Sequence, residues 1–134
     1  MEILFVCNGN VARSQEAELF FNALKADSQS LAISAGVNAM PGKPIDTLVV
    51  EAMDALGYDV SNAQRKLIDE NMVKSADLIV SFKLKDELPE YIQRHNNVRY
   101  WNVADPQHQP IEFHRRVRDS VMKSIEDLIK ELGS

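Results

Sequence analysis

One short stretch, ILFVCNGNVARS from Ile3 to Ser14, constrains the fold more than any other part of the chain. Ile3–Val6 is a run of apolar residues of the kind that forms a buried strand. A turn follows Cys7, because Gly9 and the neighbouring asparagines tolerate left-handed backbone. After Ser14 the spacing of the apolar residues becomes helical. The pattern therefore predicts a strand, a tight loop and a helix, with Cys7 at the end of the strand.

Such a loop is suited to hold an oxyanion beside a nucleophile. Free N–H groups at a helix start, together with the positive end of the helix dipole, bind phosphate-like groups. The same field favours the ionised form of a cysteine thiol. Arg13 can bind two oxygens of the anion, and Ser14 can donate to the sulfur and cap the helix. We expect Cys7 and Arg13 to be catalytic, and Asn8, Gly9, Asn10, Val11, Ala12 and Ser14 to bind the substrate.

The pattern of Cys7 followed after five residues by Arg13 and Ser14 resembles the active-site signature of the low-molecular-weight protein tyrosine phosphatases. It is also similar to that of the arsenate reductases that share their fold. The preceding strand, the Gly-Asn turn and the following helix agree with this signature, and the resemblance covers nearly the whole chain. It implies catalysis through a phosphocysteine intermediate, without a metal or an organic cofactor.

Predicted strands and helices alternate along the rest of the chain, whose 134 residues suggest one domain spanning residues 1–134. Alternation implies parallel βαβ units with right-handed crossovers. We therefore expect a three-layer α/β/α fold around a four-stranded parallel sheet, with the flavodoxin-like topology of the phosphatase family. Further strands are predicted at 30–36, 77–82 and 98–103, and helices at 15–24, 45–56, 72–76, 84–93 and 111–132.

Asp105 follows the last predicted strand and should lie at the same edge of the sheet as Cys7. Hydrolysis of a phosphate ester by a thiolate needs a proton for the departing oxygen. A carboxylic acid can supply that proton and then accept one from the attacking water. Asp105-Pro106 matches the general-acid position of the phosphatase family, so Asp105 is the third expected catalytic residue. Pro106 restricts Asp105 to extended backbone, which helps to aim its side chain.

The composition limits the expected partners. A net charge of −5 argues against nucleic acid. The longest apolar run is too short to span a bilayer, and no leader-like segment precedes Cys7, so a cytoplasmic location is the default expectation. The single cysteine excludes an internal disulfide and fits a reducing compartment. We expect a phosphorylated protein, a small phosphomonoester or arsenate as the substrate, and no membrane partner.

Two features bear on the branch of the family. Phosphatases often carry aromatic residues just after Asp-Pro that grip a phosphotyrosine ring, but this chain has Gln107-His108-Gln109. The segment Trp101–Asp119 looks more like the arsenate reductases. Thioredoxin-coupled reductases nevertheless need two further cysteines that this chain lacks, so a Cys7–arsenate adduct would require an external thiol such as glutathione or mycothiol.

Three functions follow as hypotheses. The first is a cysteine-dependent phosphatase that hydrolyses phosphomonoesters, with protein phosphotyrosine among the candidate substrates. The second is an arsenate reductase that uses an external thiol. The third is a phosphocarrier or phosphate-sensing module, ranked last because such a module needs neither Arg13 nor Asp105.

The remaining polar residues give weaker signals. The segment that includes Arg65 and Lys66 contributes to one wall near the phosphate loop in the family, but a solvated charged pair is the favoured interpretation of these two residues. The three histidines, His95, His108 and His114, have no metal-ligand spacing. His108 follows Asp105 closely, so a place at the pocket mouth is an alternative, but a surface polar residue is the favoured interpretation.

Overall fold

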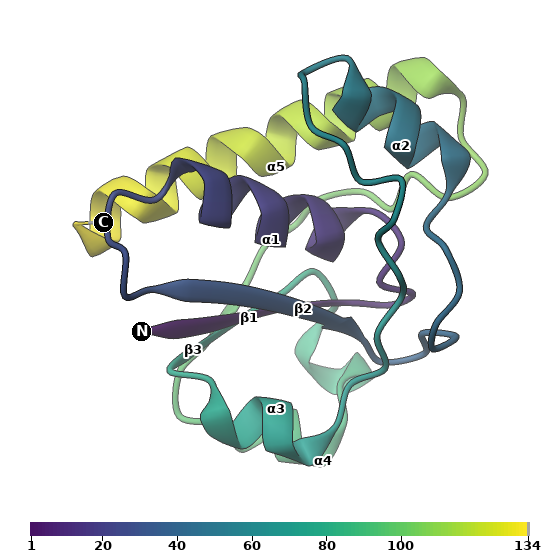
Figure 1. Ribbon diagram of the computed structural model, residues 1–134. Coiled ribbons are helices and arrows are strands. Elements are labelled where there is room, and N and C mark those ends of the chain that lie inside the picture. Colours follow the sequence, from purple (N-terminus) through teal and green to yellow (C-terminus); the bar gives the residue numbers. More distant parts are fainter. Residues whose placement is uncertain (134) are drawn as a thin grey trace.

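The computed structural model describes residues 1–133 of the chain. Its strands and helices alternate as the sequence predicts (Figure 1). The strands are β1 (Glu2–Cys7), β2 (Leu31–Gly36), β3 (Leu78–Ser81) and β4 (Val98–Tyr100). The helices are α1 (Arg13–Leu24), α2 (Thr47–Asp54), α3 (Glu70–Ser75), α4 (Glu90–Gln93) and α5 (Ile111–Leu132), and a 3-10 turn, η1, spans Lys85–Glu87.

The four strands form one parallel sheet in the order β2-β1-β3-β4. Helices α1, α2 and α5 lie on one side of it, and α3 and α4 lie on the other (Figure 1). The predicted three-layer α/β/α fold and its topology are confirmed. Because β1 is a central strand, Cys7 at its carboxyl end lies in the middle of the sheet edge, where ligands bind in folds of this kind.

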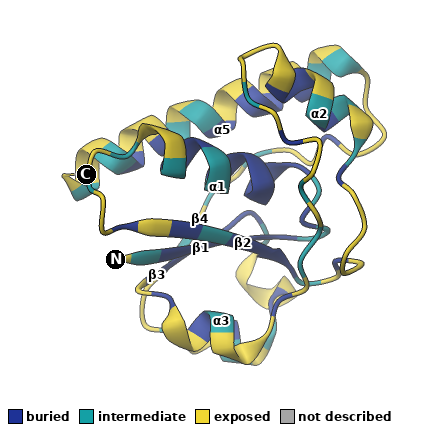
Figure 2. Ribbon diagram, viewed as in Figure 1, coloured by how far each residue is buried: buried dark blue, intermediate teal, exposed yellow. Residues whose placement is uncertain are grey.

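Strand β1 is buried along most of its length (Figure 2). Its side chains divide between two cores. Ile3, Phe5 and Cys7 belong to the core under α1 and α5, whereas Leu4 and Val6 belong to the core under α3 and α4. Alternate residues of a strand point to opposite faces, which explains the division. Cys7 therefore lies on the face covered by α1, so the sulfur meets the start of that helix.

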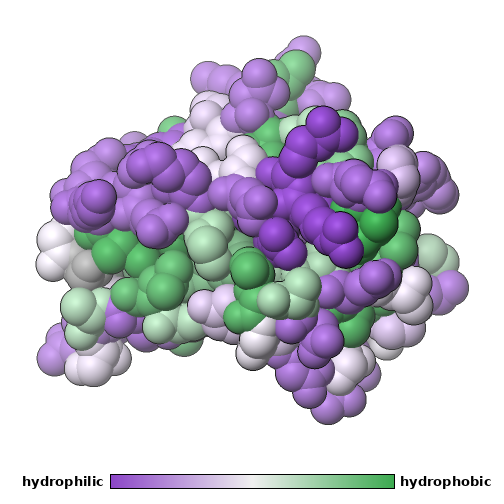
Figure 3. Space-filling view, turned by 90° about the horizontal axis from the view of Figure 1, so that it is seen from above, coloured by the Kyte–Doolittle hydropathy of each residue, from purple (hydrophilic) through white to green (hydrophobic). Residues whose placement is uncertain are grey.

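The outer surface differs sharply from these cores. The face seen in Figure 3 is mostly hydrophilic, with hydrophobic side chains confined to smaller areas. Helix α5 is amphipathic, because Val117, Val121, Ile125 and Leu128 are buried while the residues between them are largely exposed. Among residues 1–133, no helix is long and apolar enough to cross a membrane.

Several predicted boundaries differ from the structure, most clearly those of the helix predicted over 84–93, of β4 and of α2. The single helix predicted over 84–93 is wrong, because Pro89 stands at the N-cap of α4 and Leu88 before it is extended. A residue that precedes proline is disfavoured in the helical region, so the chain breaks there. Strand β4 ends at Tyr100 rather than at residue 103. Helix α2 begins at Thr47 rather than at residue 45, since the Asp46 side chain accepts from the Leu48 N–H and caps the helix.

Candidate active site

The loop between β1 and α1 is shaped by close backbone approach. Asn10 has a φ of 54°, a left-handed conformation that asparagine tolerates better than most residues. Gly36 at the end of β2 pairs with Cys7 and lies directly against the loop. A Cβ atom at Gly36 would stand 2.7 Å from both the Asn10 nitrogen and the Asn8 carbonyl oxygen. The loop can therefore pack on β2 only because residue 36 has no side chain.

The Asn10 side chain holds the loop from behind. Its Nδ2 donates to Ser14 Oγ at 2.8 Å and to Ser34 Oγ at 3.0 Å. Its Oδ1 accepts from Gln15 Nε2 at 2.9 Å and from the Lys66 backbone N–H at 2.8 Å. Asn10 is fully buried, and its contacts with Ser14, Ser34 and Gln15 are buried with it. Asn10 thus joins the loop, α1, β2 and the segment before α3 into one hydrogen-bonded unit.

Asn8 anchors the start of the loop to two other segments. Its Oδ1 accepts from Asn38 Nδ2 at 2.9 Å and from Lys83 Nζ at 3.0 Å. Its backbone carbonyl also accepts from the Asn38 N–H at 2.9 Å. Lys83, just after β3, is therefore a cation beside the loop that the sequence pattern alone does not reveal.

The sulfur of Cys7 has two polar contacts. Ser14 Oγ lies 2.8 Å from Cys7 Sγ, and the Asn10 N–H donates to the sulfur at 3.3 Å. Cys7 is only 2% exposed. Both groups can donate a hydrogen bond to the sulfur. The prediction that Ser14 also caps α1 is wrong, because the helix begins at Arg13 and the N-cap position is Ala12.

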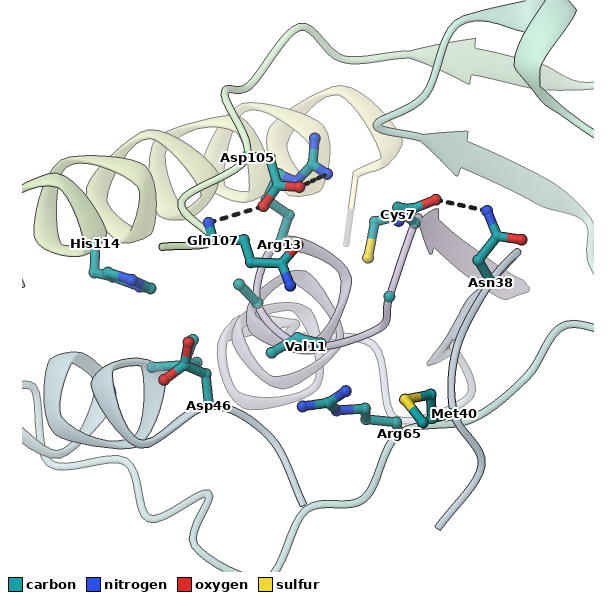
Figure 4. Close-up of a pocket in the computed structure, with 14 residues that line it drawn as sticks. Cys7, Val11, Arg13, Asn38, Met40, Asp46, Arg65, Asp105, Gln107 and His114 are labelled. Atoms are coloured by element: carbon teal, nitrogen blue, oxygen red, sulfur yellow. Dashed lines mark hydrogen bonds and ion pairs between the residues drawn. The ribbon is translucent and has the colours of Figure 1, made fainter. Parts of the chain in front are cut away.

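Arg13 brings the ends of three segments together. Its Nη1 donates to the carbonyl oxygens of Val103 at 3.0 Å and Phe82 at 3.4 Å, and its guanidinium lies 5.8 Å from the centre of the Phe82 ring. Its Nη2 lies 3.6 Å from Asp105 Oδ2. Asp105 is 48% exposed and accepts from the Gln107 N–H at 3.0 Å. The three residues expected to be catalytic therefore meet at one place (Figure 4).

A cavity of about 160 Å³ lies over this group. Of the residues expected to bind substrate, Asn8, Gly9, Val11 and Ala12 line it, together with Cys7, Arg13 and Asp105. Asn10 and Ser14, which were also expected to bind substrate, do not line the cavity. Their side chains hydrogen-bond each other behind the loop. Arg65 forms part of the wall, as the family resemblance implies. The volume accommodates a tetrahedral oxyanion, since a water molecule occupies only about 30 Å³.

The sequence pattern assigns no role in the site to three further residues, which lie on α1, at the N-cap of α2 and on α5. Asp46 and His114 line the cavity, and Glu16 is buried nearby on α1. Burial raises the pKa of Glu16 to about 8, although the charges of Arg118 and Arg13 oppose the rise. Glu16 and His114 occupy positions of their helices that face the core. A polar residue at a position where the helical spacing predicts an apolar one was the sequence signal that could have identified both. Among residues 1–133, no cluster of three or more His, Cys, Asp or Glu side chains could hold a metal ion.

Similar proteins are found both by sequence and by structure. Residues 2–134 match the family described as low molecular weight phosphotyrosine protein phosphatase. The chain is 32% identical to an arsenate reductase of Staphylococcus aureus (strain Newman) over 130 residues, which cover 93% of each chain.

Two solved structures share the fold over almost their full lengths. One is the low molecular weight protein tyrosine phosphatase from T. tengcongensis, with a TM-score of 0.89, 30% identity, and coverage of 98% of this chain and 99% of that one. The other is a mutant of the YwlE arginine phosphatase with a phosphorylated active-site serine, with a TM-score of 0.89, 26% identity, and coverage of 100% and 97%. The chain belongs to the low molecular weight phosphotyrosine protein phosphatase family.

Proposed function

We propose that this protein hydrolyses phosphomonoesters and that Cys7 is its nucleophile. The observation that carries the proposal is the surroundings of the sulfur. Cys7 Sγ contacts the Asn10 N–H and the Ser14 hydroxyl and lines a cavity shared with Arg13 and Asp105. A buried structural cysteine would need neither the donors nor the open cavity.

The first chemical step transfers the phosphoryl group to the enzyme. Cys7 Sγ attacks phosphorus, an S–P bond forms, and the bond between phosphorus and the leaving oxygen breaks. Protonated Asp105 gives its proton to that oxygen. Arg13 and the backbone N–H groups of the loop residues that line the cavity stabilise the charge on the equatorial oxygens.

The second step regenerates the enzyme. Water attacks phosphorus while the Asp105 carboxylate accepts its proton, the S–P bond breaks, and inorganic phosphate leaves. Asp105 is suited to both tasks because it is half exposed at the cavity, where water and the leaving group both pass. Its contact with Arg13 keeps the carboxyl group beside the phosphoryl site.

Steady-state hydrolysis of aryl phosphates tests this mechanism. Cys7→Ser should abolish turnover, and Asp105→Asn should slow the hydrolysis of phenyl phosphate strongly. Asp127→Asn changes an exposed carboxylate of α5 that does not line the cavity, so it serves as the control and should leave the rate unchanged. Full activity of Cys7→Ser would remove the proposal.

The physiological substrate is a phosphorylated protein or a small phosphomonoester in the cytoplasm. The family name points to phosphotyrosine, and the YwlE neighbour is named an arginine phosphatase. Phosphotyrosine and phosphoarginine peptides of matched sequence, assayed by phosphate release, would decide between these two classes.

A second candidate function is arsenate reduction, favoured by the 32% identity to an arsenate reductase. Cys7 would displace water from arsenate and form an S–As bond. An external thiol would then attack the sulfur, release arsenite and leave a mixed disulfide, which a second thiol would reduce. The chain has one cysteine, so both of these thiols must come from outside. Oxidation of glutathione or mycothiol that depends on both arsenate and Cys7 would support this function. If neither thiol is oxidised in the presence of arsenate, the result would oppose it.

A further inference from the structure

His114 lies in the first turn of α5 and is buried inside the wall of the active-site cavity. Its residue exposure is 1%, and neither ring nitrogen has a hydrogen-bond partner among the described residues. The residue nevertheless lines the cavity. In Figure 4 the His114 side chain points from α5 into the pocket, and Cys7 lies on the opposite side of the same pocket.

An imidazole without partners is unfavourable in a shielded wall, because its donor and acceptor have both lost their hydrogen bonds to water. Within residues 1–133, Glu16 is the other buried side chain whose polar atoms lack partners, and it does not line the cavity. His114 differs from Glu16 in this respect, because its side chain is part of the wall that a molecule bound in the cavity would touch.

The wall around His114 is polar. Asp46 lies below it in Figure 4, and Gln107 lies between it and the catalytic group. The phosphoryl group is expected at Cys7 and Arg13, and these three side chains line the same cavity. A leaving group that lies along this wall would therefore meet them. The loop after Asp105 contributes Gln107 to the wall, where the resemblance to phosphatases leads one to expect an aromatic residue.

We propose that His114 hydrogen-bonds the leaving group of the substrate, so that the pocket selects phosphate esters whose leaving group carries a hydroxyl or N–H group over esters with a bare apolar ring. The proposal rests on the proposed phosphatase function. It adds a residue of α5 to a site whose proposed catalytic residues come from the end of β1, the start of α1 and the segment after β4, and it makes His114 a residue that determines specificity.

Two esters that differ by one hydroxyl group test the proposal. Tyrosol phosphate and para-ethylphenyl phosphate share the aryl oxygen that leaves, and only the former has a hydrogen-bonding group at the far end. The measured quantity is the ratio of kcat/KM for the two esters. The proposal predicts that His114→Phe lowers this ratio by about tenfold, the loss expected from one shielded hydrogen bond.

His114→Gln, which keeps a donor and an acceptor, should recover part of the ratio. His95→Gln is the matched control, because His95 contacts the Ala76 carbonyl away from the cavity, and it should keep the wild-type ratio. A merely structural His114 would give His114→Phe a changed Tm with an unchanged ratio, and that result would overturn the proposal. Hydrolysis of neither ester by the wild-type protein would instead reject the phosphatase function and the inference with it.

A second measurement covers the case in which His114→Phe does not fold. The ring signals of His114 in the wild-type protein are followed by NMR during titration with inorganic phosphate and with the phosphonate analogue of tyrosol phosphate. The proposal predicts that the phosphonate shifts these signals and that phosphate alone does not. Equal shifts with both ligands, or none with either, would overturn it.

Discussion

Glu16→Gln should stabilise the protein at alkaline pH, because the substitution removes a carboxyl group that is buried without a hydrogen-bond partner. Glu16 is 1% exposed, and both of its carboxyl oxygens lack a partner. Burial raises the pKa of this group from 4.5 to about 8 in the folded protein. Glutamine has nearly the same size and cannot ionise, so the comparison isolates the cost of the charge.

The direction of the pH dependence follows from proton binding. Between about pH 4.5 and pH 8 the folded protein holds a proton on Glu16 that the unfolded chain has lost. The contribution of Glu16 to stability therefore falls as the pH rises through this window. Each unit by which the pKa is raised corresponds to about 1.4 kcal/mol of unfolding free energy. The rise from 4.5 to about 8 therefore costs on the order of 5 kcal/mol of stability above pH 8. The advantage of Glu16→Gln should be small near pH 4.5 and largest above about pH 8.

Urea denaturation of both proteins across this pH range measures the difference in unfolding free energy. Glu126→Gln, a change to an exposed glutamate of α5, is the control and should give a small difference that varies little with pH. The reasoning would be refuted if Glu16→Gln became less stable relative to the wild-type protein as the pH rose. That result would mean that Arg13 and Arg118 hold Glu16 as a stabilising carboxylate, since these are the charges that oppose its raised pKa.

The phosphate loop yields three more predictions. Gly36→Ala should abolish vanadate binding, measured by inhibition or calorimetry, because the new Cβ atom would meet two backbone atoms at 2.7 Å. Gly9→Ala should weaken vanadate binding less, since its Cβ atom would meet only the Val11 side chain at 3.1 Å. Asn10→Ala should lower the unfolding free energy by about 2–4 kcal/mol and weaken vanadate binding, because it leaves several buried groups unpaired; unchanged denaturation would contradict this. Arg13→Lys should lower kcat/KM for aryl phosphates by at least about a hundredfold, since lysine lacks the planar fork that binds two oxygens, and a wild-type rate would exclude Arg13 from the mechanism.

Local patterns were sufficient to predict the part of the fold that positions the site. Ile3–Val6 is apolar throughout because β1 is covered on both faces, and the turn residues that follow it lead directly into α1. Asp105 could be placed near Cys7 because parallel strands bring their carboxyl ends to one edge. In each case the signal lay in a few adjacent residues or in the topology.

The residues that were missed depend on contacts between distant segments. Glu16 and His114 are polar, and only the packing of α1 against α5 and the position of the cavity make them buried. Lys83 reaches Asn8 across 75 positions of the chain. The helix predicted over 84–93 fails for a local reason, because Pro89 disfavours helical backbone at Leu88 even though the apolar residues around it have helical spacing.

The central claim is that a phosphoryl group passes through the sulfur of Cys7, and trapping that intermediate tests it most directly. The Asp105→Asn variant is mixed with p-nitrophenyl phosphate, whose leaving group departs without an acid, so the intermediate should accumulate for lack of a base to activate water. After rapid quenching, mass spectrometry of the digested protein should find one phosphoryl group on the peptide that contains Cys7. Release of p-nitrophenol with no phosphoryl group on Cys7 would contradict the account.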